Sequence, residues 1–245
     1  MFLRFSTSSS KFSIPSPKSL LAIPFARKAQ KKVYQWAYKP HKTQQKVLRK
    51  LIKKAKNTAF GKDHNFNQIT SYSEFKQQVK ISDYEGLRAY IDRVVSGEKD
   101  VLWKGKPLYF AKTSGTTSGA KYIPITKESM PTHIKAAKEA LLCYIAEKND
   151  ASFVNGKMIF LQGSPVLEAL NGIKLGRLSG IVAHYVPQYL LKNRLPSWET
   201  NCIEDWETKV NAIVEETFNE NMSVISGIPS WVQMYFEKLQ QEGNK

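Results

Sequence analysis

A segment rich in glycine and hydroxyl side chains stands out among the residues that can carry chemistry. It runs from Lys112 to Lys121 and reads Lys-Thr-Ser-Gly-Thr-Thr-Ser-Gly-Ala-Lys, with strand-like runs at 107–111 and 122–126 on either side. Glycines let backbone N–H groups approach a ligand closely, hydroxyl groups donate hydrogen bonds to oxygens, and a lysine adds a positive charge. The combination predicts a loop that wraps a polyphosphate, although the same residues are also typical of a flexible hairpin turn.

The spacing of the glycines excludes the two commonest phosphate-binding motifs. A Walker A loop needs a glycine, four residues, Gly-Lys and then Ser or Thr. Here three residues separate Gly115 from Gly119, and Lys121 does not follow a glycine. The dinucleotide-binding fingerprint needs a third glycine that this segment lacks. A serine hydrolase is also excluded, because Ser114 does not lie in a Gly-x-Ser-x-Gly motif.

Residues 113–121 resemble the phosphate loop of acyl-adenylate-forming enzymes. The flanking sequence narrows this resemblance to the auxin-responsive Gretchen Hagen family of acyl acid–amido synthetases, because four other segments are similar to that family and follow the same order. These segments are 51–61, 84–93, 96–98 and 225–231. The resemblance covers most of residues 34–245.

The resemblance implies an ATP-dependent ligase with two half-reactions. A carboxylic acid first attacks ATP to give an acyl-adenylate and pyrophosphate, and an amine or amino acid then displaces AMP to form an amide. The implied cofactors are ATP and Mg²⁺, and the implied partners are the small-molecule acid and the amine. The residues that match the phosphate-binding positions are Ser114, Gly115, Thr116, Thr117, Ser118, Gly119 and Lys121. The resemblance assigns neither a catalytic residue nor a metal ligand.

Motifs that complete such an enzyme are missing from this sequence. They are an aromatic-x-x-Ser/Thr-Glu segment, a later Tyr-Arg-x-Gly-Asp-like motif and a C-terminal lid; the segment 93–98 is similar to the second motif but precedes the loop. We therefore expect a basic, serine-rich arm at 1–33 and a partial adenylation domain at 34–245, a fragment completed by a continuation or by a separate C-terminal half. The alternative is a non-catalytic truncated remnant that acts as a basic membrane- or partner-binding module.

The positive charge of the chain is concentrated near its N-terminus. The net charge is +16, and residues 1–62 contain 16 Lys and Arg and no acidic residue. The first twenty residues include seven serines, a composition that fits an organellar transit peptide as well as a disordered arm. No run reaches the roughly twenty apolar residues of a transmembrane segment, and two cysteines, Cys143 and Cys202, indicate no disulfide framework. These features favour a cytoplasmic protein, with an organelle as the alternative.

A basic amphipathic helix is predicted at about 43–58, with Gly61 placed to end it. Its apolar stripe consists of Val47, Leu48, Leu51, Ile52 and Ala55. Such a helix can lie on anionic lipid, follow a nucleic-acid backbone, or dock on its own domain with a solvated basic face. The resemblance favours docking, since it already places a helix here. Specific nucleic-acid binding is not expected, because the sequence has neither zinc-ligand spacing nor a ribonucleoprotein motif.

The rest of the sequence predicts an α/β fold with a largely parallel sheet and covering helices, the N-terminal part of an acyl-adenylating enzyme fold. Helical periodicity begins near 126–131 and recurs over 203–220. The expected core-facing residues are Ile134, Ala137, Leu141 and Ile145 in the first helix, and Trp206, Val210, Ile213, Val214 and Phe218 in the second. Strands are predicted at 157–161 and 222–226, the latter buried, and Pro229 is expected to open the last helix.

Ligand sites of open α/β sheets lie beyond the carboxyl ends of the strands. The residues that follow the two predicted strands are therefore candidates for lining an acyl or nucleotide pocket: Gln162, Gly163, Ser164, Gly227, Pro229, Ser230 and Trp231. Gly227 and Pro229 are also ordinary turn residues. His184 and Tyr185 follow another apolar run, and a pocket role and a purely structural role are both compatible with that position.

Overall fold

The structure is a computed structural model that describes residues 17–113 and 120–243. Its helices are α1 (Pro17–Ala37), α2 (Pro40–Ala55), α3 (Ala59–Asp63), α4 (Tyr72–Gln78), α5 (Tyr84–Val95), α6 (Met130–Lys148), the 3-10 helix η1 (Ser152–Asn155), α7 (Leu178–Ala183), α8 (Gln188–Leu191), α9 (Trp198–Cys202), α10 (Trp206–Thr217) and α11 (Pro229–Gly243). Its strands are β1 (Tyr109–Thr113), β2 (Lys121–Ile125), β3 (Lys157–Leu161), β4 (Glu168–Leu170), β5 (Ile173–Gly176), β6 (Arg194–Leu195) and β7 (Met222–Gly227). No described helix is long and apolar enough to cross a membrane.

The strands form two sheets, and the predicted α/β class is confirmed. Sheet A has the order β2-β1-β5-β4; β1 runs parallel to β5, whereas the β1–β2 and β4–β5 pairs are antiparallel. Sheet B has the order β6-β3-β7 and is parallel throughout. The antiparallel pairs arise because short connections permit only hairpins. Asn171 and Gly172 make the two-residue turn between β4 and β5, both at positive φ, as type I′ turns require.

Each sheet has its own hydrophobic core. In sheet A, Phe110 packs with Ile173 and Leu175 of β5 and with Val94 of α5. In sheet B, Ile159 and Leu161 of β3 pack against α10 and α11, where the buried partners are Val210, Ile213, Val214 and Tyr235. The helix predicted at 203–220 therefore covers the strand predicted at 157–161. Proline opens α11 as predicted.

Two predictions about buried residues are wrong. Phe218 follows the end of α10 and is 45% exposed, so it does not continue the buried face of that helix. The strand at 222–226 is present but not buried, because β7 lies at the edge of sheet B and presents mostly exposed side chains. The face expected to be buried on α6 is only partly covered, since Ile145 is buried whereas Ala137 and Leu141 are exposed.

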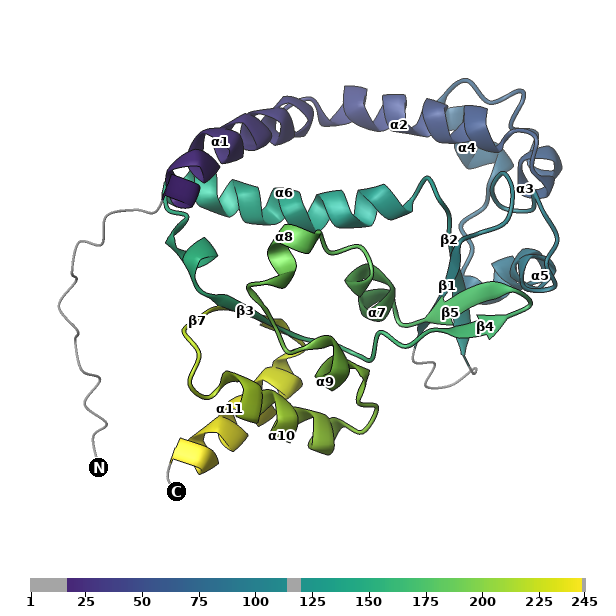
Figure 1. The fold of residues 1–245 in the computed structure, drawn as a ribbon. Helices are drawn as coiled ribbons and strands as arrows, with labels where there is room; N and C mark the ends of the chain where they lie inside the picture. Colours follow the sequence, from purple (N-terminus) through teal and green to yellow (C-terminus); the bar gives the residue numbers. More distant parts are fainter. Residues whose placement is uncertain (1–16, 114–119, 244–245) are drawn as a thin grey trace.

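The first two helices form an arch that spans the length of α6 (Figure 1). The boundary expected after residue 33 falls inside α1. Ala26 of α1 is fully buried against Ile145 of α6 and Ala151, and Arg27 Nη2 donates a hydrogen bond to Asn149 Oδ1 at 2.9 Å. These contacts attach the first part of the arch to α6.

The second part of the arch, α2, is docked along only part of its apolar stripe. Ile52 and Ala55 are buried with Phe66 and Ile69, whereas Val47 remains half exposed. The helix begins at a proline, which its first turn tolerates. The structure thus bears out docking for the C-terminal half of this helix and leaves its apolar N-terminal half uncovered by the described residues.

Gly61 lies where α3 meets the end of α2, and we expect its replacement by alanine to destabilise the protein. A Cβ atom added there would stand 2.9 Å from the Ala55 carbonyl carbon and nearer still to its oxygen. Backbone atoms cannot move aside without distorting the chain, so the free energy of unfolding, measured by urea denaturation, should fall by roughly 1–3 kcal/mol. Gly243→Ala is the control, because its Cβ would meet nothing nearer than 4.0 Å. Equal losses in the two variants would contradict this explanation.

Candidate functional site

The predicted phosphate loop is anchored by the β1–β2 hairpin of sheet A. Thr113 pairs with Lys121 across the two antiparallel strands, so the two ends of the loop are adjacent. The candidates Ser114, Gly115, Thr116, Thr117, Ser118 and Gly119 lie outside the described residues. We call Lys112 and Thr113, the last two residues of β1, the loop root.

Lys121, the remaining candidate, lies on β2 beside α5. Its Nζ stands 5.4 Å from the centre of the Tyr84 ring, a cation–π arrangement. The Tyr84 hydroxyl in turn accepts a hydrogen bond at 2.9 Å from the backbone N–H of Tyr122. Tyr84 therefore holds both the backbone of β2 and the lysine side chain. Lys121 is not among the residues that line the pockets described below.

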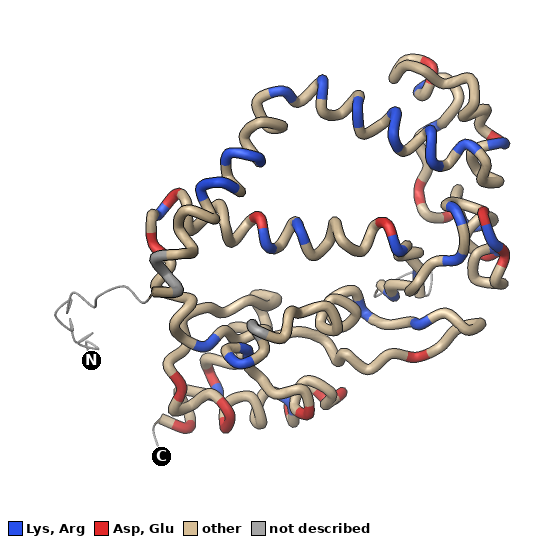
Figure 2. Tube along the Cα trace, turned by 45° about the horizontal axis from the view of Figure 1, so that its top comes forward, with Lys and Arg blue, Asp and Glu red and all other residues tan. Residues whose placement is uncertain are grey.

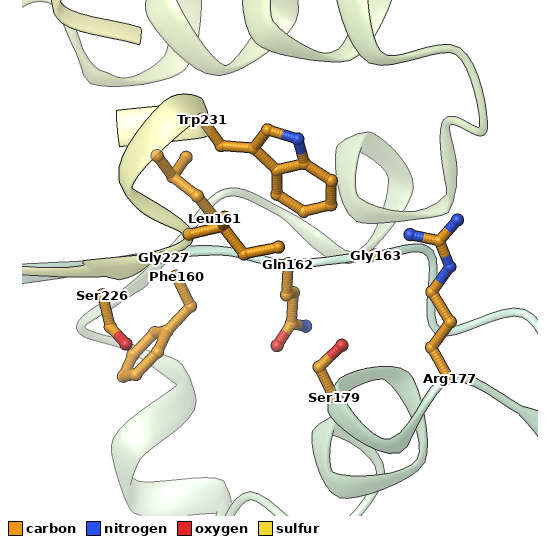
Figure 3. A pocket seen from close by; sticks show the side chains of 10 residues that line it. Phe160, Leu161, Gln162, Gly163, Arg177, Ser179, Ser226, Gly227 and Trp231 are labelled. Atoms are coloured by element: carbon orange, nitrogen blue, oxygen red, sulfur yellow. The ribbon is translucent and has the colours of Figure 1, made fainter. Parts of the chain in front are cut away.

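Two adjoining pockets open at the carboxyl ends of β3 and β7, with volumes of about 390 and 340 Å³. Both are lined by Gln162, Gly163, Arg177 and Trp231, so they form one cleft, which we call the strand-end cleft. Its apolar part is lined by Phe160, Leu161, Ile228 and Trp231 (Figure 3). Its charged part is lined by Lys112, Glu168, Arg177, Glu204 and Lys209.

The cleft brings together most of the residues predicted after β3 and β7. Gln162, Gly163, Ser164, Gly227 and Trp231 line it. The neighbours Pro229 and Ser230 do not appear among its lining residues. The loop root also lines the cleft, through Lys112 and Thr113. The end of β1 therefore lies at the same place at which β3 and β7 of sheet B end.

Gln162 supplies an unpaired hydrogen-bond donor to the cleft. Its side-chain Nε2 is buried and has no hydrogen-bond partner within the described part of the chain. The amide points away from Trp231 and toward the side of β3 on which Ser179 lies (Figure 3). A buried amide without a partner costs about 1–3 kcal/mol. A ligand atom that accepts this hydrogen bond would offset that cost.

Arg177 lies between the two parts of the cleft, and sequence analysis did not identify it. It precedes α7 and its side chain rises past Gly163 (Figure 3). A Cβ atom at position 163 would stand 2.7 Å from Arg177 Cδ, so a glycine is needed for this close passage. Arg177 is solvent-exposed, which leaves its guanidinium accessible. A guanidinium binds carboxylates and phosphates through paired N–H donors.

Lys209 adds a second cation that sequence analysis did not identify. It lies on α10, is only 2% exposed, and donates a hydrogen bond from Nζ to the Asn201 carbonyl oxygen at 2.5 Å. Burial lowers the pKa of its amine, since desolvation disfavours the charged form. With Lys112 and Arg177, it gives the charged part of the cleft three basic residues against Glu168 and Glu204. The cleft therefore suits an anionic ligand.

Stacked tryptophans form one wall of the cleft. The rings of Trp206 and Trp231 lie 4.2 Å apart between centres and within 18° of parallel. Trp206 Nε1 donates a hydrogen bond to Met234 Sδ at 3.2 Å. Trp206 was predicted as core and Trp231 as a pocket candidate, and the two act as one rigid surface. This wall suits an apolar or planar group.

His184 and Tyr185 have structural partners and do not line the cleft. His184 Nε2 donates a hydrogen bond to the Pro165 carbonyl oxygen at 2.9 Å, and its ring meets the Trp198 ring at 74°. The Tyr185 hydroxyl donates to the Tyr109 hydroxyl at 3.0 Å. This hydrogen bond, together with burial, raises the pKa of Tyr185 to about 12. These contacts attach α7 to sheet A.

Metal binding by protein side chains alone finds no support in residues 17–113 and 120–243. They contain no group of three or more His, Cys, Asp or Glu side chains placed to hold an ion. A Mg²⁺ ion in such a site would take most of its ligands from phosphate oxygens and water, as is usual for this ion.

The two sheets, the loop root and the strand-end cleft define an α/β protein in which the end of β1 lines a cationic cleft. Residues 29–207 match the GH3 family N-terminal domain. The chain therefore belongs to the GH3 family, and the resemblance to the Gretchen Hagen synthetases is confirmed.

Curated relatives of the chain are plant amido synthetases. Jasmonoyl–L-amino acid synthetase JAR4 of Nicotiana attenuata is 27% identical over 138 residues, which are 55% of this chain and 23% of JAR4. Indole-3-acetic acid-amido synthetase GH3.15 of Arabidopsis thaliana is 32% identical over 93 residues, which are 37% of this chain and 16% of that protein. The matched region thus spans about a quarter or less of either relative.

Solved structures share the fold. The GH3.15 acyl acid amido synthetase has a TM-score of 0.65 at 19% identity, over 81% of this chain and 36% of the other. The same protein in complex with 2,4-DB has a TM-score of 0.65 at 20% identity, over 81% of this chain and 35% of the other. The similarity confirms that this chain has the α/β architecture of those enzymes.

Proposed function

We propose that this chain carries the ATP-phosphate-binding part of an acyl acid–amido synthetase, a ligase that joins a carboxylic acid to an amine or amino acid. The observation that carries the proposal is that the loop root lines the strand-end cleft together with Arg177. Family membership supports it, because the relatives named above are a jasmonoyl–L-amino acid synthetase and an indole-3-acetic acid-amido synthetase.

The proposed chemistry divides into two balanced steps. A carboxylate oxygen of the acid forms a bond to the α-phosphorus of ATP, and the bond from that phosphorus to pyrophosphate breaks. The amine nitrogen then forms a bond to the acyl carbon and loses a proton to water, and AMP leaves as the carbon–oxygen bond breaks. The first step gathers negative charge at the phosphates, so fixed hydrogen-bond donors and cations at that place lower its barrier.

In this proposal the hydroxyl groups of Ser114, Thr116 and Thr117 donate hydrogen bonds to phosphate oxygens, and Gly115 and Gly119 allow the backbone to approach them. The neighbouring Ser118 and Lys121 complete the phosphate-binding set. Mg²⁺ accompanies the nucleotide and neutralises phosphate charge. The carboxylic acid lies in the apolar part of the cleft, and Arg177, which lies between the two parts, binds the phosphates.

The matched region covers 23% of JAR4, so the complete reaction draws on groups that the described residues do not contain. We propose that residues 34–245 act as a partial adenylation domain. The groups that bind the adenine, the ribose and the amine would belong to polypeptide outside this sequence, as a continuation or as a separate C-terminal half.

Replacing both loop threonines tests the phosphate role. Mg-ATP at a hundred times its Kd should stabilise the native chain by about 2.7 kcal/mol, which raises the unfolding midpoint by roughly 5–10 °C. Thr116→Val combined with Thr117→Val should lose most of this rise, because valine keeps the shape but not the donors. Pyrophosphate exchange, measured in the complete enzyme, should fall in parallel.

Thr132→Val is the matched control for this experiment, because Thr132 is exposed on α6 outside the strand-end cleft. This control variant should keep the full rise of the unfolding midpoint in Mg-ATP. A double variant that responds to Mg-ATP as the native chain does would remove the phosphate role from the loop.

A further inference from the structure

An apolar groove lies on the arch, far along the chain from the strand-end cleft. It has a volume of about 480 Å³ and is formed by the end of α1 and the first half of α2. We call it the arch groove; its lining includes Trp36, Pro40, Val47, Leu48 and Leu51. Trp36 and Val47 are each 50% exposed and Leu51 is 47% exposed. Leu48 packs in part against the cluster of Ile52, Phe66 and Ile69, so the uncovered apolar side chains are those of Trp36, Val47 and Leu51.

Basic residues surround this groove without acidic neighbours on the same helices. Neither α1 nor α2 contains Asp or Glu. Lysines and arginines follow one another along both helices (Figure 2). On α2, the exposed Lys46, Lys50 and Lys53 repeat at helical spacing beside the apolar stripe. Lys54 is committed to an ion pair with Glu128, and Lys50 also lies in the field of that carboxylate, whereas Lys46 and Lys53 form no ion pair with a described acidic residue.

We propose that the arch docks on an anionic lipid surface. A helix that binds a membrane interface combines an apolar face carrying Trp and Leu with a basic polar face. The arch groove supplies the apolar face, and Lys46, Lys50 and Lys53 supply the basic face. Each lysine near an anionic surface contributes about 1 kcal/mol. The inference stands on α1 and α2 alone and does not rest on the proposed ligase activity.

Lipid explains the surface better than a nucleic acid does. A phosphate backbone would engage the lysines, but it would leave Trp36, Val47 and Leu51 exposed to water. A lipid surface engages both kinds of residue at once. Docking through the arch would leave the strand-end cleft free, because the cleft lies at the ends of β3 and β7, on the other side of α6 (Figure 1).

Vesicle flotation of the full chain tests this proposal. Vesicles of phosphatidylcholine with 30% phosphatidylserine should carry the chain, and vesicles of phosphatidylcholine alone should not. Lys46→Glu combined with Lys50→Glu should weaken binding by about tenfold or more, since two attractive charges become repulsive. Val47→Ser combined with Leu51→Ser should weaken it independently of charge. Circular dichroism of each variant confirms that it remains folded.

The matched control is Lys99→Glu combined with Lys174→Glu, which changes the net charge equally at exposed positions outside the arch and the cleft. It should retain binding within about twofold. Absence of binding to anionic vesicles would overturn the proposal. Equal losses in the control and the Lys46/Lys50 variant would also overturn it, as would full competition by duplex DNA at the same phosphate concentration, which indicates a general polyanion surface.

Discussion

Replacing Arg177 with alanine is expected to weaken Mg-ATP binding by about tenfold to a hundredfold, because a hydrogen bond to a charged group contributes about 1.5–3 kcal/mol. Arg177 lines both parts of the strand-end cleft and passes Gly163 to reach the charged part, beside the loop root. Arg177 and Lys112 are the exposed cations there, and only Arg177 offers paired donors, whereas the Lys209 amine is buried and already donates to a carbonyl oxygen. Isothermal titration calorimetry on the full chain measures the change in Kd.

Two further variants make this prediction specific. Arg177→Lys keeps the charge but loses the paired donors, so it should recover only part of the affinity. Arg88→Ala removes an exposed arginine of α5 that pairs with Glu85, and it should bind Mg-ATP as the native chain does. Native affinity in Arg177→Ala would show that the cleft does not hold the phosphates.

Phe110→Ala should lower the free energy of unfolding by about 3–5 kcal/mol, the usual cost of removing a phenylalanine side chain from a core. Phe110 is 0% exposed and is the largest side chain of the sheet A cluster, where it packs with Val101, Ile173 and Leu175. A loss of this size is a large part of the 5–15 kcal/mol that stabilises a typical domain. Urea denaturation followed by circular dichroism measures it.

Phe236→Ala is the control for this second prediction. Phe236 is 51% exposed on α11, so its replacement should change the free energy of unfolding by less than about 1 kcal/mol. A loss below 1 kcal/mol in Phe110→Ala would contradict the packing of β1 against β5. Since β1 ends at the loop root, a weakened β1 should also reduce the thermal stabilisation by Mg-ATP.

The elements predicted best from sequence are those specified by nearby residues. The strand at 157–161 is a continuous apolar run, and the helix after it shows a regular 3.6-residue period. Asn171-Gly172 is a strong hairpin signal as well, but it was not used, and for that reason sheet A was expected to be more parallel than it is. The local signal was present in the sequence.

The charged part of the cleft depends on contacts between distant segments. Arg177 reaches the loop root because β1 pairs with β5, which places Phe110 opposite Leu175. No local pattern specifies that pairing. Lys209 lies on the same helix as Val210, and periodicity alone does not tell which neighbours of a core residue line a cleft. The phosphate loop was identified instead from composition and family resemblance.

Local sequence patterns also could not predict how deeply each element is buried. The apolar stripe of α2 is visible in the sequence from Val47 to Ala55, but contacts with distant residues such as Phe66 and Ile69 decide which part of it is covered. The same holds for β7, whose apolar residues predicted a buried strand. Burial of a strand requires neighbours on both edges and both faces, and among the described strands only β3 pairs with β7.

The β1–β2 hairpin is held by strand pairing, whereas the proposed phosphate contacts belong to the connection between its strands. Five facing residue pairs, from Tyr109–Ile125 to Thr113–Lys121, set its register. Because closing a connection of this kind costs little that depends on its exact sequence, substitutions in it should be nearly neutral for folding. A gene of this family can therefore lose its hydroxyl groups at these positions and still encode a well-folded protein. Inactive descendants would persist with the architecture of their active ancestors, and the residues at positions 114–119 would distinguish them.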